Sequence, residues 1–170
     1  MIKFALQNKL IELRRSNKGV ALVELSLLLP MVILLVGGTV ELSRAFYQFQ
    51  IADKGVKSAA RYLARIPGNQ VCPPASAAWT AGQVAAKNLA QRGSLSAGDP
   101  FTLSNWQNAN DVTIAVSCVD NSTGGYVGGD SIPVVNVSTS FTFDDLGFLG
   151  IVKLNNINIT TSHQEVYIGG

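Results

Sequence analysis

The sequence predicts an α+β protein in which a long N-terminal helix, first transmembrane and then amphipathic, packs against a small antiparallel sheet. Three observations predict this class. A nearly uncharged apolar stretch covers residues 19–40, an apolar repeat of three and four residues continues to residue 66, and three segments of alternating apolar and polar residues follow after residue 111. At 170 residues, the chain has room for an anchor and one modest domain.

The first element is predicted to cross a membrane. Residues 19–40 read GVALVELSLLLPMVILLVGGTV and carry a single charged side chain, Glu24. As a helix this stretch is about 33 Å long, which matches a hydrocarbon core of about 30 Å. A core helix of a soluble protein has a polar stripe, whereas Leu25 to Val36 is apolar on nearly every face. We therefore expect a transmembrane helix over residues 20–40.

The charges before this helix predict its orientation. Residues 1–19 form a basic leader with five Lys or Arg side chains against one Glu. By the positive-inside rule the leader stays in the cytoplasm and the C-terminal part lies outside. An ordinary secretory signal is disfavoured, because its apolar run is shorter and ends in an A-x-A-like pattern that is absent at Gly37-Gly38-Thr39.

Residues 41–66 continue the helix out of the membrane as an amphipathic rod, because their apolar residues recur at helical spacing. We expect Pro67-Gly68 to end it at residue 66. Residues 67–170 should then form an α+β extracytoplasmic domain. We expect a helix over about 76–92, opened by Pro73-Pro74 and closed by Gly93. Strands are expected over 112–118, 135–143 and 157–168, and a glycine-rich hairpin loop over 124–129 connects the first two.

Glu24 is the most informative side chain of the predicted anchor. An acid near the bilayer centre costs about 2.5 to 3.5 kcal/mol, so such a residue is usually retained for a function. The alternative is that Glu24 lies close enough to the cytoplasmic edge to reach water or headgroups. Its setting favours a function, because it stands five residues after Gly19, a glycine that itself ends the basic leader.

This pattern of a basic leader, Gly19, four apolar residues and Glu24 resembles the prepilin-peptidase site of type IV pilins and their relatives. The resemblance implies that prepilin peptidase cuts after Gly19, that Val20 becomes the new N-terminus, and that Glu24 is the fifth residue of the mature chain. A free amine at Val20 could then pair with the Glu24 carboxylate of a neighbouring subunit.

A closer resemblance is to the TadE-like family, the minor pilins or pseudopilins of Tad (Flp-type) pilus systems. The stretch KGVALVELSLLLPMVILLVGGTVELSRAF is similar to their N-terminal signature, with Pro30 in mid-helix, the pair Gly37-Gly38 and a second acid, Glu41. The segment DKGVKSAARYLAR, residues 53–65, is similar to the continuation of that helix. The resemblance covers roughly residues 14–66.

The family resemblance implies a pilin-like fold and a structural role in pilus biogenesis, supporting adhesion or secretion. Its implied partners are prepilin peptidase, other pilins, the assembly machinery and the membrane. Glu24, Glu41 and Pro30 are the implied contacts with subunits or machinery. The implied location is a single pass in the bacterial inner membrane, with the domain in the periplasm or at the pilus or cell surface. The alternative is a membrane-anchored envelope binding module that never enters a pilus.

The remaining residues argue against other classes of function. Cys72 and Cys118 are expected to form one disulfide if the domain is exported, and are otherwise two packed thiols. They form no CxxC, and the lone His163 has no partner at ligand spacing, so we expect no metal, no cofactor and no enzymatic activity.

A net charge of +2 without a basic stripe argues against binding of nucleic acid, and no small-molecule substrate is indicated. Loops around Trp106 and Tyr126 are either contact surfaces or, more often in such loops, packing.

Overall fold

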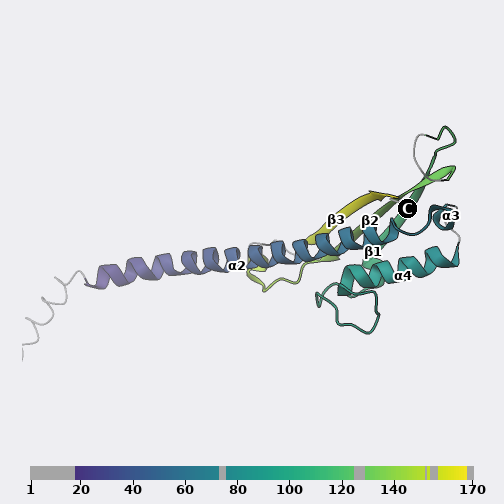
Figure 1. Cartoon of the computed structure of the whole chain (residues 1–170). Coiled ribbons are helices and arrows are strands. Elements are labelled where there is room, and N and C mark those ends of the chain that lie inside the picture. Colours follow the sequence, from purple (N-terminus) through teal and green to yellow (C-terminus); the bar gives the residue numbers. More distant parts are fainter. Residues whose placement is uncertain (1–17, 73–75, 125–128, 152, 154–156, 168–170) are drawn as a thin grey trace, which may run out of the picture.

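The computed structural model describes residues 18–72, 76–124, 129–151, 153 and 157–167 (Figure 1). The first 17 residues of the predicted leader, the pair Pro73-Pro74 and the loop residue Tyr126 lie outside the described residues. Along the chain, three helices (α2, α3, α4) and the 3₁₀ helix η1 come first, followed by β1, β2, the short helix α5 and β3. The three strands form one antiparallel sheet in the order β1-β2-β3. The predicted α+β class, with a long N-terminal helix packed against a small antiparallel sheet, is confirmed.

The long helix α2 spans Lys18–Leu63 and has two halves with different surroundings. Every side chain from Val20 to Val36 is exposed, and burial begins at Gly37. Figure 1 shows this half as a bare rod, while the other half lies along the sheet and α4. The regular helix ends at Leu63, three residues before the predicted end, because the N–H groups of Arg65 and Ile66 donate to carbonyls three residues back and tighten the last turn.

Two shorter helices follow, α3 (Gly68–Val71) and α4 (Ala77–Arg92). The predicted helix over 76–92 is confirmed together with its two ends. The Oγ of Ser76 accepts a hydrogen bond from the Trp79 N–H at 3.0 Å, which satisfies a donor at the start of α4. Gly93 has φ 70° and takes the left-handed conformation that commonly closes a helix.

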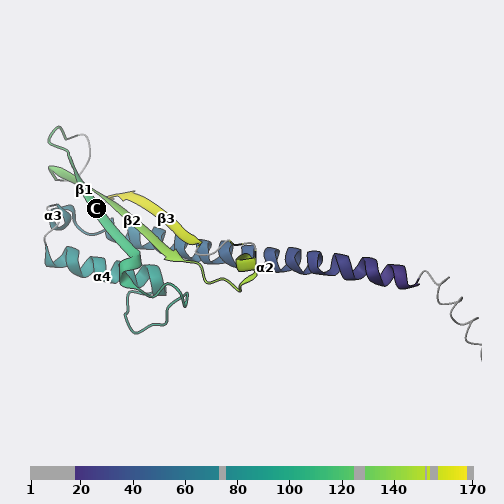
Figure 2. The ribbon, with the colours of Figure 1, turned by 180° about the vertical axis from the view of Figure 1, so that it is seen from behind.

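The sheet contains β1 (Val112–Asp120), β2 (Ser131–Thr142) and β3 (Asn158–Val166). All three predicted strands are present, and β1 and β2 extend beyond the predicted bounds. Side chains alternate along the central strand β2, so that one face is buried and the other carries Asn, Ser and Thr. The 3₁₀ helix η1 (Ala109–Asp111) leads into β1, and the short helix α5 (Phe148–Ile151) lies in the connection from β2 to β3 (Figure 2).

The core lies where the second half of α2 meets α4 on one side and the sheet on the other. Small residues on α2 allow this close approach: a Cβ at Gly55 would lie 2.3 Å from the Ala90 carbonyl oxygen of α4. The apolar stripe predicted for residues 41–66 supplies much of this core, whose most deeply buried members are Ala52, Val56, Ala59, Ala60, Leu63, Ala86, Trp106 and Val137.

Trp106 anchors the long connection between α4 and β1 in this core. Its ring is fully buried, stacks on Phe141 with the centroids 5.3 Å apart, and donates its indole N–H to the Oγ1 of Thr139 at 2.9 Å. Of the two interpretations of the Trp106 loop, packing is therefore the one that the structure favours.

We expect Trp106→Phe to lower the free energy of unfolding by about 1 to 2 kcal/mol, because the stacking on Phe141 survives while the buried hydrogen bond and some ring volume are lost. Urea unfolding of the detergent-solubilised chain, followed by circular dichroism, measures the change. Val84→Ala, on the exposed face of α4, is the control and should be nearly neutral. Equal stability of the two variants would contradict this role of Trp106.

Candidate functional site

The bare half of α2 has the dimensions and surface of a membrane anchor. From Val20 to Val36 it presents an unbroken set of exposed, mostly aliphatic side chains, and these 17 residues rise about 26 Å. The hydroxyl of Ser26 donates to the Val23 carbonyl at 2.8 Å, so this polar group is satisfied within the helix. The helix is long and apolar enough to cross a membrane by length and composition.

Glu24 stands exposed on this apolar surface. Within the part of the chain that the structure describes, its carboxylate makes no hydrogen bond or ion pair, so the fold itself gives Glu24 no partner. Val20 lies one turn earlier on the same side of α2, because residues four apart share a helix face. A carboxylate placed in lipid in this way requires a partner from outside the chain, or water.

The predicted processing site lies in the first turn of α2. Gly19 and Val20 are both exposed, and nothing lies within 4 Å of the position that a Cβ at Gly19 would occupy. Among the described residues the backbone here is therefore open to an approaching protease.

Pro30 lies in the middle of the bare half, inside the helix. Because proline has no N–H, the Ser26 carbonyl four residues earlier loses its helical donor. In a membrane such a carbonyl needs another donor, which neighbouring helices commonly provide.

Where the bare half ends, α2 meets the connection between β2 and β3. Both carboxylate oxygens of Glu41 accept backbone hydrogen bonds, from the N–H of Leu146 at 2.7 Å and from the N–H of Leu149 at 2.8 Å. Glu41 is fully buried by these contacts. One turn earlier, Gly37 lies beneath the Phe148 ring, which would be 2.5 Å from a Cβ at that position. Two residues of the predicted signature, Gly37 of the glycine pair and the second acid Glu41, thus make intramolecular contacts at this junction.

Polar and aromatic side chains mark the next turns of α2. Phe46, Tyr47 and Phe49 are exposed, and Arg44 is half-buried, with its Nη1 buried and without an acceptor among the residues that the structure describes. Exposed aromatic rings beside an apolar span are typical of the boundary between membrane and water, where lipid headgroups also accept hydrogen bonds from Arg. The distribution of residues along α2 therefore changes from aliphatic to interfacial between Val36 and Phe49.

Cys72 and Cys118 form a disulfide, as predicted for an exported domain. Their Cα atoms are 6.0 Å apart, and the bond joins the end of α3 to β1 across 46 residues of chain. The bond in this way ties the end of α3, just before α4, to the sheet at the end of the molecule farthest from the bare helix (Figure 1).

Charged side chains fasten β3 to α2. The Lys57 ammonium 2.7 Å away holds the pKa of the Asp53 carboxyl below its ordinary value, and the hydroxyl of Thr161 on β3 donates to the same carboxyl at 3.2 Å. The hydrogen bond from His163 at 2.9 Å similarly lowers the pKa of Glu165. His163, the residue that an enzyme of this composition would need most, is therefore engaged in a partly exposed pair with Glu165 on the same strand, β3.

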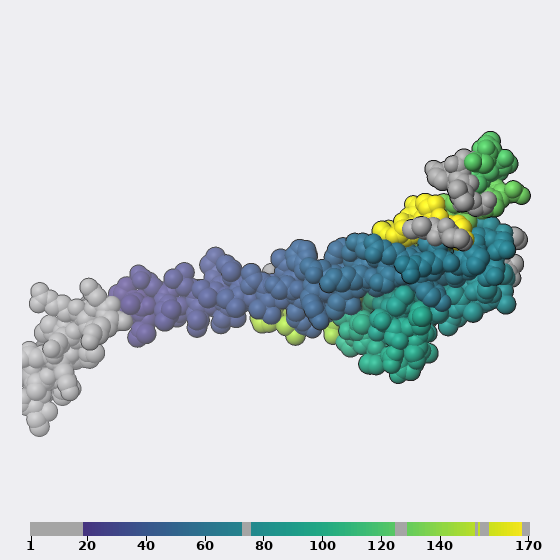
Figure 3. All heavy atoms as spheres, in the orientation of Figure 1, coloured from purple at the N-terminus to yellow at the C-terminus, as the bar shows by residue number. Residues whose placement is uncertain are grey.

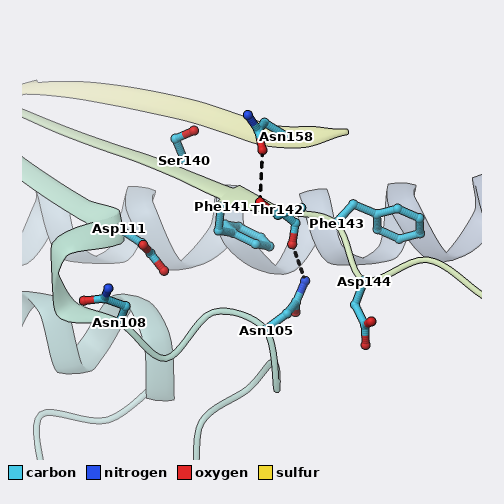
Figure 4. A pocket seen from close by; sticks show the side chains of 9 residues that line it. All are labelled: Asn105, Asn108, Asp111, Ser140, Phe141, Thr142, Phe143, Asp144 and Asn158. Atoms are coloured by element: carbon cyan, nitrogen blue, oxygen red, sulfur yellow. Dashed lines mark hydrogen bonds between the residues drawn. The ribbon is translucent and has the colours of Figure 1, made fainter. Parts of the chain in front are cut away.

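A hollow with a mainly polar lining lies between β2, the start of β3 and the loop before η1 (Figure 4). It is an open cavity of about 620 Å³. The Nδ2 of Asn105 donates to the Thr142 carbonyl at 2.8 Å, and the Thr142 hydroxyl donates to the Asn158 side-chain oxygen at 3.2 Å. The lining consists of amides, hydroxyls, two phenylalanines and the carboxylates of Asp111 and Asp144, without His, Cys or Lys. No group of three metal-ligating side chains occurs among the described residues.

Fold and anchor together define the class of protein: an α+β head carried on a helix whose first half can span a membrane. Residues 19–61 match the model of the family described as TadE-like protein. The predicted resemblance to the TadE-like family is thereby confirmed over this segment, and it points to a protein associated with the Tad pilus. Comparison with curated proteins and with solved structures finds no match for the chain.

The matched segment covers the bare half of α2, the junction at Gly37 and Glu41, and most of the stripe that packs against α4 and β3. The partners of Glu41 and Gly37 in the β2–β3 connection are what sequence reasoning missed. A signal was present, because Leu146-Gly-Phe-Leu-Gly-Ile151 is an apolar run in the connection between two strands, directly after Asp144-Asp145.

Proposed function

We propose that the chain is a minor pilin or pseudopilin of a Tad-type pilus, made as a precursor and cut after Gly19 by prepilin peptidase. The observation that carries this proposal is the bare half of α2, a fully exposed apolar helix of 17 residues from Val20 to Val36. It carries one acid near its start, Glu24, to which the described part of the chain gives no partner. Such a surface is stable in lipid, or among the helices of neighbouring subunits, and not in water. The TadE-like match over residues 19–61 supports the same function.

In this proposal the head lies outside the cytoplasmic membrane and supports adhesion or secretion. Two features favour that orientation. Five basic residues precede the anchor and are expected to remain in the cytoplasm, and the Cys72–Cys118 disulfide suits an oxidising compartment. Other pilins and the assembly machinery would be the partners of the bare helix, and Glu24 and Pro30 are its proposed contact residues.

Processing tests this proposal directly. Co-expression with a prepilin peptidase should shorten the chain by the 19 residues before Val20, as measured by intact mass and N-terminal sequencing, and expression without the peptidase should leave it uncut. Gly19→Leu should block the cut, since the enzyme must accommodate the residue before the scissile bond. Gly38→Leu, a glycine in the same helix with open space around it, is the matched control and should be cut normally. An intact Met1 in the presence of active peptidase would refute the proposal.

We propose a structural rather than a catalytic role for the head. The cavity at Asn105 and Asn158 favours the second candidate, an anchored envelope binding module, because its amides, hydroxyls and carboxylates are suited to polar ligands. Location separates the two candidates. A pilus subunit should be recovered in sheared filament fractions, whereas a binding module that never polymerises should stay wholly in the membrane fraction.

A further inference from the structure

The connection between β2 and β3 presents apolar side chains to solvent beside the anchor. We call residues 144–151 the foot. Leu146 is 55% exposed and Ile151 is 62% exposed, while Phe148 and Leu149 are half-buried. Figure 3 shows the yellow-green atoms of this connection on the flank of α2, between the bare rod and the rest of the head. Large aliphatic side chains at the tip of a connection are unfavourable in water and call for an apolar partner.

The foot is held firmly to α2. Its backbone is tied at two points by Glu41, through the N–H groups of Leu146 and Leu149, and its Phe148 ring lies on Gly37. Hydrogen bonds to a buried carboxylate are among the stronger ones in proteins. The exposed side chains of Leu146 and Ile151 are thus fixed at the level of helix residues 37–41.

Charged residues on α2 indicate how deep that level lies in a bilayer. Between Lys18 and Arg44 the helix carries two acids, exposed Glu24 and buried Glu41, and no basic residue. Lys18 and Arg44 are separated by about 39 Å along the axis, close to the 40 to 45 Å of a bilayer including its headgroup regions. The level of residues 37–41 then falls about 5 to 10 Å inside Arg44, at the outer boundary of the hydrocarbon core.

We propose that the foot is a second membrane contact of this protein, with Leu146 and Ile151 inserted beside α2 into the outer leaflet of the lipid bilayer. The inference rests on the membrane anchoring in the proposed function and adds a lipid-binding surface on the head. A helix alone leaves the head free to rotate and tilt, whereas a helix and a foot attached at its side fix the orientation of the head on the membrane. The burial of Glu41 under the foot also keeps that carboxylate out of lipid.

We expect the foot to interact with lipid through apolar contacts rather than through charges. Asp144 and Asp145 begin the foot, and Lys153 follows two residues after its end, so this segment carries no net positive charge. Insertion should therefore occur in zwitterionic phosphatidylcholine and should not require anionic lipid.

The test measures where the foot lies in a bilayer. The full chain is placed in phosphatidylcholine nanodiscs with a nitroxide label on a single introduced cysteine, which is possible because both native cysteines are joined in the disulfide. Collision with oxygen, which concentrates in lipid, is compared with collision with a water-soluble nickel chelate. Labels at Leu146→Cys and Ile151→Cys are compared with a lipid reference at Leu35→Cys and a water reference at Thr123→Cys, in the β1–β2 hairpin.

The foot positions should give an oxygen-to-nickel ratio several-fold above that at Thr123 and close to that at Leu35. If the foot positions gave a ratio like that at Thr123 while Leu35 gave a lipid-like ratio, the inference would be overturned, but the membrane anchor would still be supported. Water-like ratios at both Leu35 and Leu146 would overturn the anchor as well. Low collision with both reagents at the foot would mean that protein covers it, and would also overturn the inference.

A matched pair of variants tests the attachment to α2. Gly37→Ala places a methyl group 2.5 Å from the Phe148 ring, whereas Gly38→Ala adds one in open space. With the label at Leu146, Gly37→Ala should shift the ratio toward the water value by displacing the foot, and Gly38→Ala should leave it unchanged. Equal ratios in the two variants would contradict the docking of the foot through Gly37.

Discussion

Replacing Cys72 and Cys118 together by Ser is expected to lower the free energy of unfolding of the head by about 4 kcal/mol, because the disulfide closes a 46-residue loop and restricts the unfolded chain. A change of this size shifts the folding equilibrium by nearly a thousandfold. Trp79 and Trp106 both lie inside the closed loop and are buried in the fold. Urea unfolding of the detergent-solubilised chain, followed by tryptophan fluorescence, therefore reports directly on the segment that the bond restrains.

Reduction of the unaltered protein supplies an independent comparison, since it should reproduce the loss seen in the double variant. Ser117→Ala, at the exposed position next to Cys118, is the matched control and should stay within about 0.5 kcal/mol of the parent. A loss smaller than about 1 kcal/mol in the double variant would mean that the packing of α4 on α2 and the sheet already restrains the unfolded chain, contrary to the role argued for the bond.

The elements of this fold were predictable where a periodic pattern spans many residues. The apolar run of residues 20–36, interrupted only by Glu24 and Ser26, and the helical spacing that follows predict one long helix, and α2 runs from Lys18 to Leu63. Gly93 predicts the C-terminal end of α4, because glycine readily takes the left-handed conformation that closes a helix. Alternation predicts the three strands, since one face of the sheet packs on α2.

Contacts between distant segments could not be predicted in this way. Helix α5 has four residues, too few for any period to be visible. The bonds from Leu146 and Leu149 to Glu41 join residues 105 and 108 positions apart, and nothing local in either segment indicates them. Similarly, the interpretation of Trp106 as core packing depends on the stacking with Phe141 and the hydrogen bond to Thr139, which exist only in the folded arrangement.

The two acids on α2 differ in whether the fold supplies hydrogen-bond donors to their carboxylates. Glu41 lies at the junction, where the head itself supplies two N–H donors and covers the carboxylate. Glu24 lies in the bare half, where the described part of the chain supplies none. A carboxylate that is hydrogen-bonded within the fold contributes to the structure of the subunit. A carboxylate that has no such bonds and lies on an apolar surface can pair with a group of another molecule.

We therefore expect Glu24→Gln to be processed at Gly19 but to lose incorporation into filaments by more than about tenfold, since breaking a charge pair in low dielectric costs several kcal/mol. In the proposed pairing, the free amine at Val20 of one subunit meets the Glu24 carboxylate of a neighbour that is displaced by about one helical turn, or roughly 6 Å along the axis. The glutamine has nearly the same shape and keeps a hydrogen-bonding oxygen, so the change removes the charge while preserving the helix.

Intact mass measures cleavage of each variant, and immunoblotting of sheared filaments against membranes measures incorporation. Ser26→Ala, two residues away on the same bare half and satisfied by its own helix, is the matched control and should be incorporated normally. An uncut Glu24→Gln precursor would show that the carboxylate serves recognition by the peptidase instead of subunit pairing. Normal cleavage with normal incorporation would refute both roles, because a charge in lipid that can be removed without consequence has no partner there.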